Sequence, residues 1–65
     1  MIRNKVPDLR RESGLTQEEL ARRLNVTRQT IISLEKNRYT PSLEMAFKVA
    51  ALFAKEVEEI FEYIP

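Results

Sequence analysis

The stretch that decides the fold is residues 17–36, QEELARRLNVTRQTIISLEK. Its apolar residues recur at spacings of three and four, which predicts two short helices joined by a tight turn. In the first helix Leu20 and Leu24 lie on one face, and in the second Ile31 and Leu34 do the same. These four side chains are therefore expected to point into a core.

The ends of both predicted helices carry capping signals. Thr16 and Glu19 form a capping box, and Thr27 is a second N-cap ahead of the next helix. Asn25 lies at the turn and tolerates the left-handed conformation that a sharp turn needs. Small Ala21 lets the second helix pass close to the first at a steep angle.

Turning Ile31 and Leu34 inward decides which residues of the second helix face outward. At about 100° per residue, the opposite side carries polar groups and one aliphatic side chain, namely Arg28, Gln29, Ile32, Ser33 and Lys36. Arg reads guanine, Gln reads adenine, and an aliphatic group contacts the thymine methyl. This face therefore matches the chemistry of base edges in the major groove.

The two helices resemble the helix-turn-helix of the lambda repressor, Cro and Xre-type regulators. Ala21, the apolar spacing and the TRQTI opening of the second helix carry the likeness, which continues through Pro41-Ser42 and Glu59-Ile60-Phe61. Asn25 departs from it, because that family usually has Gly there. The resemblance implies an all-α, five-helix, single DNA-binding domain over residues 1–65, with its helix-turn-helix at 17–36.

The resemblance also implies that the protein is a sequence-specific transcriptional regulator, in particular a repressor. It would bind double-stranded DNA as a homodimer, on a pseudo-palindromic operator. The base-reading residues would be Arg28, Gln29, Ile32 and Ser33. The phosphate-contacting residues would be Gln17, Thr30, Lys36, Asn37, Arg38 and Tyr39. Two of these keep an alternative: Thr30 could serve helix packing, and Tyr39 could close its loop as a half-buried aromatic.

Arg10 could be taken for a DNA contact. In the family that the chain resembles, however, an Arg at this position pairs with a Glu at the end of the recognition helix, and Glu35 stands at the matching place. Arg10 and Glu35 are therefore expected to form a structural ion pair.

The remaining chain predicts three more helices. The first begins near Asn4 or Lys5 and ends at Ser13, before Gly14. Another, residues 43–54, is apolar on most sides and is expected to be the buried spine of the core. The last begins at residue 56 or 57 and ends at 61 or 62, and the break before it is weakly signalled, so these two helices could run nearly continuously. A short ladder between residues 2–3 and 63–64 is also possible.

A dimer contact is expected near the C-terminus, where apolar groups exceed what a small monomer needs. The expected interface residues are Val57, Ile60, Tyr63 and Ile64. An alternative function uses the same region: in an antitoxin-like or other protein-interaction module, docking of a partner protein would be the main role.

Composition excludes several classes of function. The chain has no Cys and no His, so it lacks the common thiol nucleophile, general base and metal ligands. We therefore expect no enzyme, metal, cofactor or small-molecule ligand. No apolar run reaches the roughly 18 residues of a membrane span, and a prokaryotic cytoplasmic protein is expected. The net charge is about +4 through residue 40 and about −3 beyond it. This asymmetry has two interpretations: a basic face that binds nucleic acid, or ordinary solvated surface charge.

Overall fold

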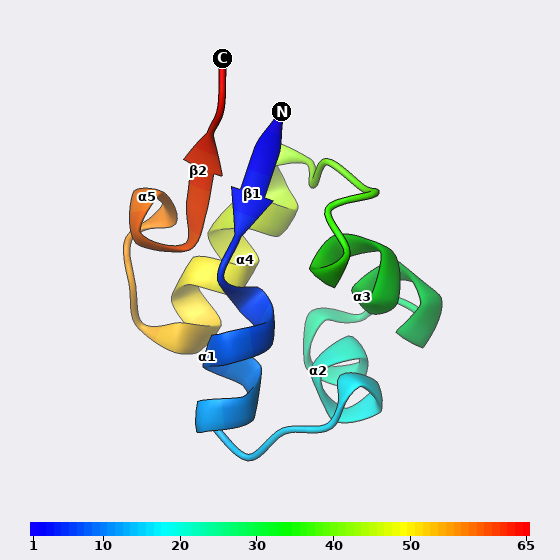
Figure 1. The fold of residues 1–65 in the computed structure, drawn as a ribbon. Helices are drawn as coiled ribbons and strands as arrows, with labels where there is room; N and C mark the ends of the chain where they lie inside the picture. Colours follow the sequence, from blue (N-terminus) through cyan, green and yellow to red (C-terminus); the bar gives the residue numbers. More distant parts are fainter.

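The computed structural model describes all 65 residues and contains five helices and two strands. The elements are, in order, β1 (Ile2–Asn4), α1 (Val6–Glu12), α2 (Gln17–Leu24), α3 (Arg28–Glu35), α4 (Leu43–Phe53), α5 (Val57–Ile60) and β2 (Phe61–Tyr63). The helices surround one apolar core, and the two strands join the ends of the chain (Figure 1). The predicted five-helix fold with a terminal ladder is confirmed.

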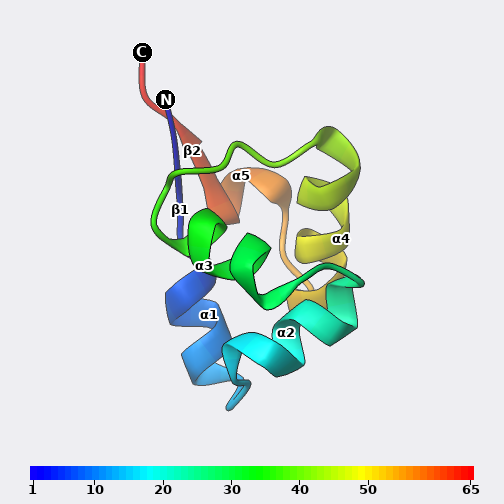
Figure 2. The same ribbon diagram turned by 90° about the vertical axis from the view of Figure 1, so that its right-hand side faces the viewer.

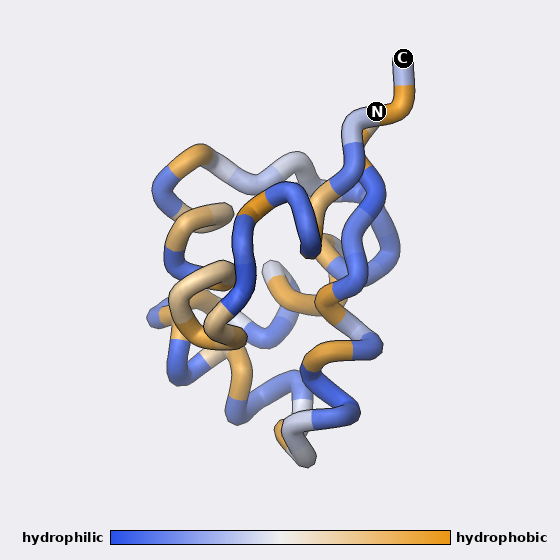
Figure 3. The backbone as a smooth tube through the Cα atoms, turned by 90° about the vertical axis from the view of Figure 1, so that its left-hand side faces the viewer, coloured by the Kyte–Doolittle hydropathy of each residue, from blue (hydrophilic) through white to orange (hydrophobic).

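The core draws side chains from all five helices. Its largest fully buried members are Leu20, Ile31, Leu34, Ile60, Val6 and Val49. Apolar and hydrophilic stretches alternate along the chain, as expected for helices with one buried face (Figure 3). No buried side-chain nitrogen or oxygen lacks a hydrogen-bond partner.

Three helices begin at a hydroxyl cap. The side-chain oxygens of Thr16, Thr27 and Ser42 each accept a hydrogen bond from the amide three residues further on, at 3.0, 3.2 and 3.1 Å. At Thr16 the capping box is complete, because Glu19 Oε1 accepts from the Thr16 amide at 2.8 Å. These caps satisfy amides that a helix leaves without an internal partner.

The four longer helices all end in the same way. Each is followed by one residue with positive φ: Gly14 (72°), Asn25 (58°), Asn37 (60°) and Ala54 (54°). The amide of the next residue then donates to a carbonyl five positions back, at 2.9–3.1 Å. This is the Schellman arrangement. Glycine, which adopts positive φ without strain, occupies only one of the four positions.

Helix α4 corrects the expectation of a helix buried on most sides. Its buried face is formed by Met45, Ala46, Val49 and Ala50. Leu43 and Phe47 on its outer face are 72% and 59% exposed. In so small a protein only one side of α4 meets other helices, here α2 and α5, and apolar periodicity cannot show which side remains uncovered.

The break between α4 and α5 is sharp, which decides against the nearly continuous helices that the sequence left open. Ala54 adopts φ 54°, and the Lys55 amide closes the turn on the Ala50 carbonyl at 3.0 Å. Helix α5 is also shorter than expected, because the chain is already extended at Phe61, with φ −114° and ψ 135°.

The terminal ladder is antiparallel, with Ile2 opposite Tyr63 and Asn4 opposite Phe61. Compared with the expected pairing of residues 2–3 with 63–64, β1 ends one residue later, and β2 begins two residues earlier and ends one residue earlier. Beyond the strands, Met1 and Ile64 exchange backbone hydrogen bonds of 2.7 and 3.0 Å. The two termini therefore lie side by side, on the opposite side of the molecule from α2 (Figures 1 and 2).

Candidate nucleic-acid interface

The second and third helices form a compact unit with α3 on the outside of the protein. Helix α2 packs against α3 across the turn at Asn25 (Figure 2). Ile31 and Leu34, the inward residues of α3, have no exposed surface. Thr27 caps α3 and Asn37 ends it, so the start, orientation and end of this helix are each set by side chains that the sequence places locally.

The remaining faces of α3 stay accessible. Arg28, Gln29 and Lys36 are exposed, whereas Ile32 and Ser33 are half-buried. Because Ile31 and Leu34 lie beneath them, these five side chains present a guanidinium, an amide, an aliphatic group, a hydroxyl and an ammonium group to one side of the molecule.

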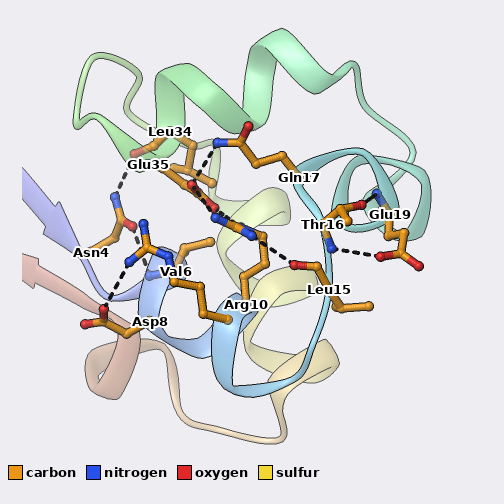
Figure 4. A network of polar contacts seen from close by, with 11 residues as sticks. Asn4, Val6, Asp8, Arg10, Leu15, Thr16, Gln17, Glu19, Leu34 and Glu35 are labelled. Carbon is orange, nitrogen blue, oxygen red and sulfur yellow. Dashed lines mark hydrogen bonds and ion pairs between the residues drawn. The ribbon is translucent and has the colours of Figure 1, made fainter.

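The structure brings Arg10 and Glu35 together (Figure 4). Arg10 donates through Nε to Glu35 Oε2 at 2.6 Å and through Nη2 to Oε1 at 3.3 Å, while its Nη1 donates to the Leu15 carbonyl at 2.9 Å. Gln17 Nε2 donates to the same Glu35 carboxylate at 3.1 Å. Only 12% of the Arg10 side chain and 7% of the Glu35 side chain are exposed. This network joins α1, α2 and the end of α3.

A hollow lies where α2 and α3 begin. It has a volume of about 450 Å³ and is lined by Arg10, Thr16, Gln17, Glu18 and Arg28. The Gln17 side chain is held by Glu35, so the group that α2 offers to an anion here is the amide end of the helix.

The same helix start affects the ionisation of Glu19. Hydrogen bonds to its carboxylate, first from the Thr16 amide and then from the Thr16 side chain, hold the pKa of Glu19 below its ordinary value. Glu19 is therefore a stable anion at the positive end of the α2 dipole.

The segment after α3 is open to solvent. Lys36, Asn37, Arg38 and Tyr39 are exposed, Tyr39 only marginally, at 37%. Thr30, in contrast, is half-buried, and its hydroxyl lies 2.9 Å from the Thr27 hydroxyl. The structure thus groups four of the expected phosphate-contacting residues and places Thr30 within the helix cap.

Asn4 is a residue of this region that sequence reasoning missed. Its Nδ2 donates to the Leu34 carbonyl at 2.8 Å and to Asn37 Oδ1 at 3.0 Å, and its Oδ1 accepts from the Val6 amide at 3.0 Å. Figure 4 shows its side chain directed at the end of α3. Its partners lie 30 and 33 positions away along the chain, so no local pattern pointed to them.

The expected dimer residues divide into two groups. Tyr63 is 71% exposed, and Val57 and Ile64 are half-buried. Ile60 is only 1% exposed, and its inclusion in an interface is wrong, because it fills the core of the protomer itself.

No group of three or more His, Cys, Asp and Glu side chains is arranged to hold a metal ion. None of the helices combines the length and the apolar character needed to cross a membrane.

Two helices joined by a tight turn, with the second helix accessible on the outside of the protein, are the arrangement of helix-turn-helix DNA-binding proteins. The helix-turn-helix family model HTH_3 matches residues 8–60. The chain belongs to this family, and it is a DNA-binding transcriptional regulator of the Xre type rather than an enzyme.

Relatives and solved structures agree with this assignment. An uncharacterised HTH-type transcriptional regulator of Methanocaldococcus jannaschii is 50% identical over 62 residues, covering 95% of this chain and 94% of that one. The cryptic phage CTXphi transcriptional repressor RstR of Vibrio cholerae is 35% identical, over 92% of this chain and 54% of its own. The crystal structure of a candidate DNA-binding protein from Bacteroides fragilis superposes with a TM-score of 0.83 at 27% identity, over 95% of this chain and all of that one.

Proposed function

We propose that the protein represses transcription by binding a pseudo-palindromic operator as a homodimer in the prokaryotic cytoplasm, with α3 in the major groove. The observation that carries this proposal is the orientation of α3. Ile31 and Leu34 are fully buried, and Arg28 and Gln29 are exposed on the other side. A helix held in this way can meet base pairs without disturbing the core.

Base reading is assigned to four side chains of α3. Arg28 suits guanine, whose O6 and N7 accept two hydrogen bonds, and Gln29 suits the N6 and N7 of adenine. Ser33 can bond to several bases, and Ile32 can contact a thymine methyl. Their accessibility supports the assignment, because all four reach the surface.

Phosphate contacts are assigned to residues at the two ends of the helix-turn-helix. At one end, the Gln17 backbone amide at the start of α2 lies beside the hollow that Arg28 lines. At the other end, Lys36, Asn37, Arg38 and Tyr39 follow α3 and are exposed. Such contacts fix the position of a protein on the duplex and carry no base information. Thr30 is a weaker candidate, because its hydroxyl is engaged with Thr27.

Dimerisation follows from the small number of bases that one domain can contact. Helix-turn-helix dimers bind half-sites about 34–36 Å apart. Val57, Tyr63 and Ile64 remain the proposed interface residues, since all three retain exposed surface. Repression is supported by the relatives that are named repressors, RstR and the immunity repressor of Bacillus phage phi105.

The experiment that tests this proposal is selection of bound sites from random duplexes, followed by two substitutions. Gln29→Ala should weaken binding to the selected site by about 1–3 kcal/mol and relax the base preference at one position of each half-site. Arg38→Ala should weaken binding to all duplexes by the same factor. It should also reduce the slope of the logarithm of affinity against the logarithm of salt concentration by about one. A Gln29→Ala protein with unchanged affinity for every duplex would refute the assigned orientation of α3 on DNA.

The oligomeric state needs its own measurement. Analytical ultracentrifugation at micromolar concentration should show a dimer, and the selected sites should contain two inverted half-sites. A monomer that selects a single half-site would rule out the homodimer.

A further inference from the structure

The terminal β ladder contacts the end of α3 through the side chain of Asn4. Two hydrogen bonds from Asn4 Nδ2, 2.8 Å to the Leu34 carbonyl and 3.0 Å to Asn37 Oδ1, link β1 to the helix end. The Val6 amide donates to Asn4 Oδ1 at 3.0 Å. Both donor hydrogens and the acceptor of this amide are therefore engaged within the protein.

The carbonyl that Asn4 meets belongs to the last turn of α3, where helix carbonyls lack intrahelical partners. The Leu34 carbonyl accepts from the Asn37 amide at 3.1 Å and from Asn4 at 2.8 Å. The end of α3 is thus held by its own Schellman turn and by a strand from the other end of the chain.

The second Asn4 contact holds the residue that redirects the chain after α3. Asn37 adopts φ 60°, the left-handed conformation that asparagine tolerates better than most residues other than glycine. Its side chain is tied to Asn4, and the exposed Arg38 and Tyr39 follow it directly. The Asn4–Asn37 contact therefore lies at the point where the chain that carries these two side chains leaves α3.

We propose that Asn4 is a positioning residue for DNA binding, which it serves by setting the segment Lys36–Tyr39 against the phosphate backbone. This inference rests on the proposed function. Asn4 acts through Asn37 and the α3 end rather than by touching DNA, because its own amide has no free donor. Charge-assisted hydrogen bonds to phosphate depend on geometry, so a segment that is released loses them.

Asn4→Ser is the decisive variant. It is neutral and keeps an oxygen for the Val6 amide, but it is too short to reach Leu34 or Asn37. The variant should bind the selected operator and a random duplex about tenfold more weakly, by the same factor. Its salt dependence should flatten by about one. Circular dichroism must show the folded protein at the temperature of the binding assay.

A double-mutant cycle separates positioning from general destabilisation. In a protein that already carries Arg38→Ala, Asn4→Ser should reduce DNA affinity by a smaller factor, because the phosphate contact that Asn4 positions is already gone. Arg28 lies at the other end of α3. The losses of binding free energy caused by Arg28→Ala and Asn4→Ser should therefore add in the double variant.

Unchanged affinity and salt dependence in Asn4→Ser would overturn the inference. So would a loss of affinity with an unchanged salt slope and additivity in both cycles, because that result describes a structural role alone. A parent protein that binds no duplex even at low salt would refute the proposed function itself, and the inference with it.

Discussion

The helix-turn-helix and the C-terminal region, residues 43–63, differ in how their helices end and in how well their apolar side chains are covered. Both have a hydroxyl cap at a helix start and a left-handed residue at a helix end. In the helix-turn-helix, asparagine takes the left-handed position and every large apolar side chain is at least partly covered. In the C-terminal region, alanine takes that position, and Leu43 and Phe47 lie open. Local side-chain chemistry therefore specifies the first region, whereas tertiary packing specifies much of the second.

The two regions also differ in their polar contacts. Glu35 joins the helix-turn-helix to α1 through Arg10. In the C-terminal region the one ion pair, Lys48 with Glu44, is at the surface, where such pairs contribute little.

The largest expected effect concerns this buried pair. Glu35→Ala leaves the Arg10 guanidinium buried without its carboxylate, which should lower the free energy of unfolding by about 3–5 kcal/mol. That is comparable to the whole stability expected for a chain of this size. Urea denaturation should show the loss. The double replacement Arg10→Met with Glu35→Leu should lower the free energy of unfolding by clearly less than the sum of the losses from Arg10→Met alone and Glu35→Leu alone. Additive losses would show that the pair is not coupled.

Two apolar residues of the C-terminal region should contribute very differently to stability. Ile60→Ala should cost about 2–5 kcal/mol, because it leaves a cavity in the core. Phe47→Ala should change stability by no more than about 0.5 kcal/mol, because Phe47 is exposed. Thermal and urea denaturation of both proteins provide the measurement. A similar loss in the two variants would mean that a second chain covers Phe47 in solution.

A smaller effect is expected at the α4–α5 turn. Ala54→Gly should raise the free energy of unfolding by about 1 kcal/mol, because glycine removes the strain of positive φ at this position. Asn25→Gly is the matched control in the helix-turn-helix and should gain less, since asparagine tolerates this conformation. Equal gains at both sites would remove this distinction between the two regions.

The smallest effect is a pH dependence at the start of α2. The folded protein holds the pKa of Glu19 below its ordinary value of 4.5 through hydrogen bonds from Thr16. This contribution to stability is complete above pH 4.5 and is lost as the pH falls through the lower, folded-state pKa. Glu19→Gln should therefore flatten the fall in stability across this acid range. An identical acid slope in parent and variant would contradict the prediction.

The sequence predicted the helix-turn-helix well because its signals are local. Thr16, Thr27 and Asn25 act on backbone groups within a few residues of themselves. The spacing of Ile31 and Leu34 was enough to orient α3. Five helices and a terminal ladder followed from such signals together with the family resemblance.

The failures share one physical cause, which is distance along the chain. Ala54 gives no left-handed signal of its own, yet it adopts φ 54° between α4 and α5, two helices that contact each other. Ile60 was assigned to an interface because an apolar residue near the C-terminus looks the same whether it meets the core or a partner. The bonds from Asn4 to Leu34 and Asn37 could not be predicted, because nothing near Asn4 specifies partners in α3.

The hydrogen bonds between Met1 and Ile64 mean that the polypeptide is almost a closed ring. A head-to-tail cyclised version would need only a short linker, on the side of the molecule away from α2. Closing the ring reduces the conformational freedom of the denatured chain, which is a common way to stabilise miniature scaffolds. A higher melting temperature of the cyclic form, with the same operator affinity, would show that the two ends can be joined covalently without loss of DNA binding.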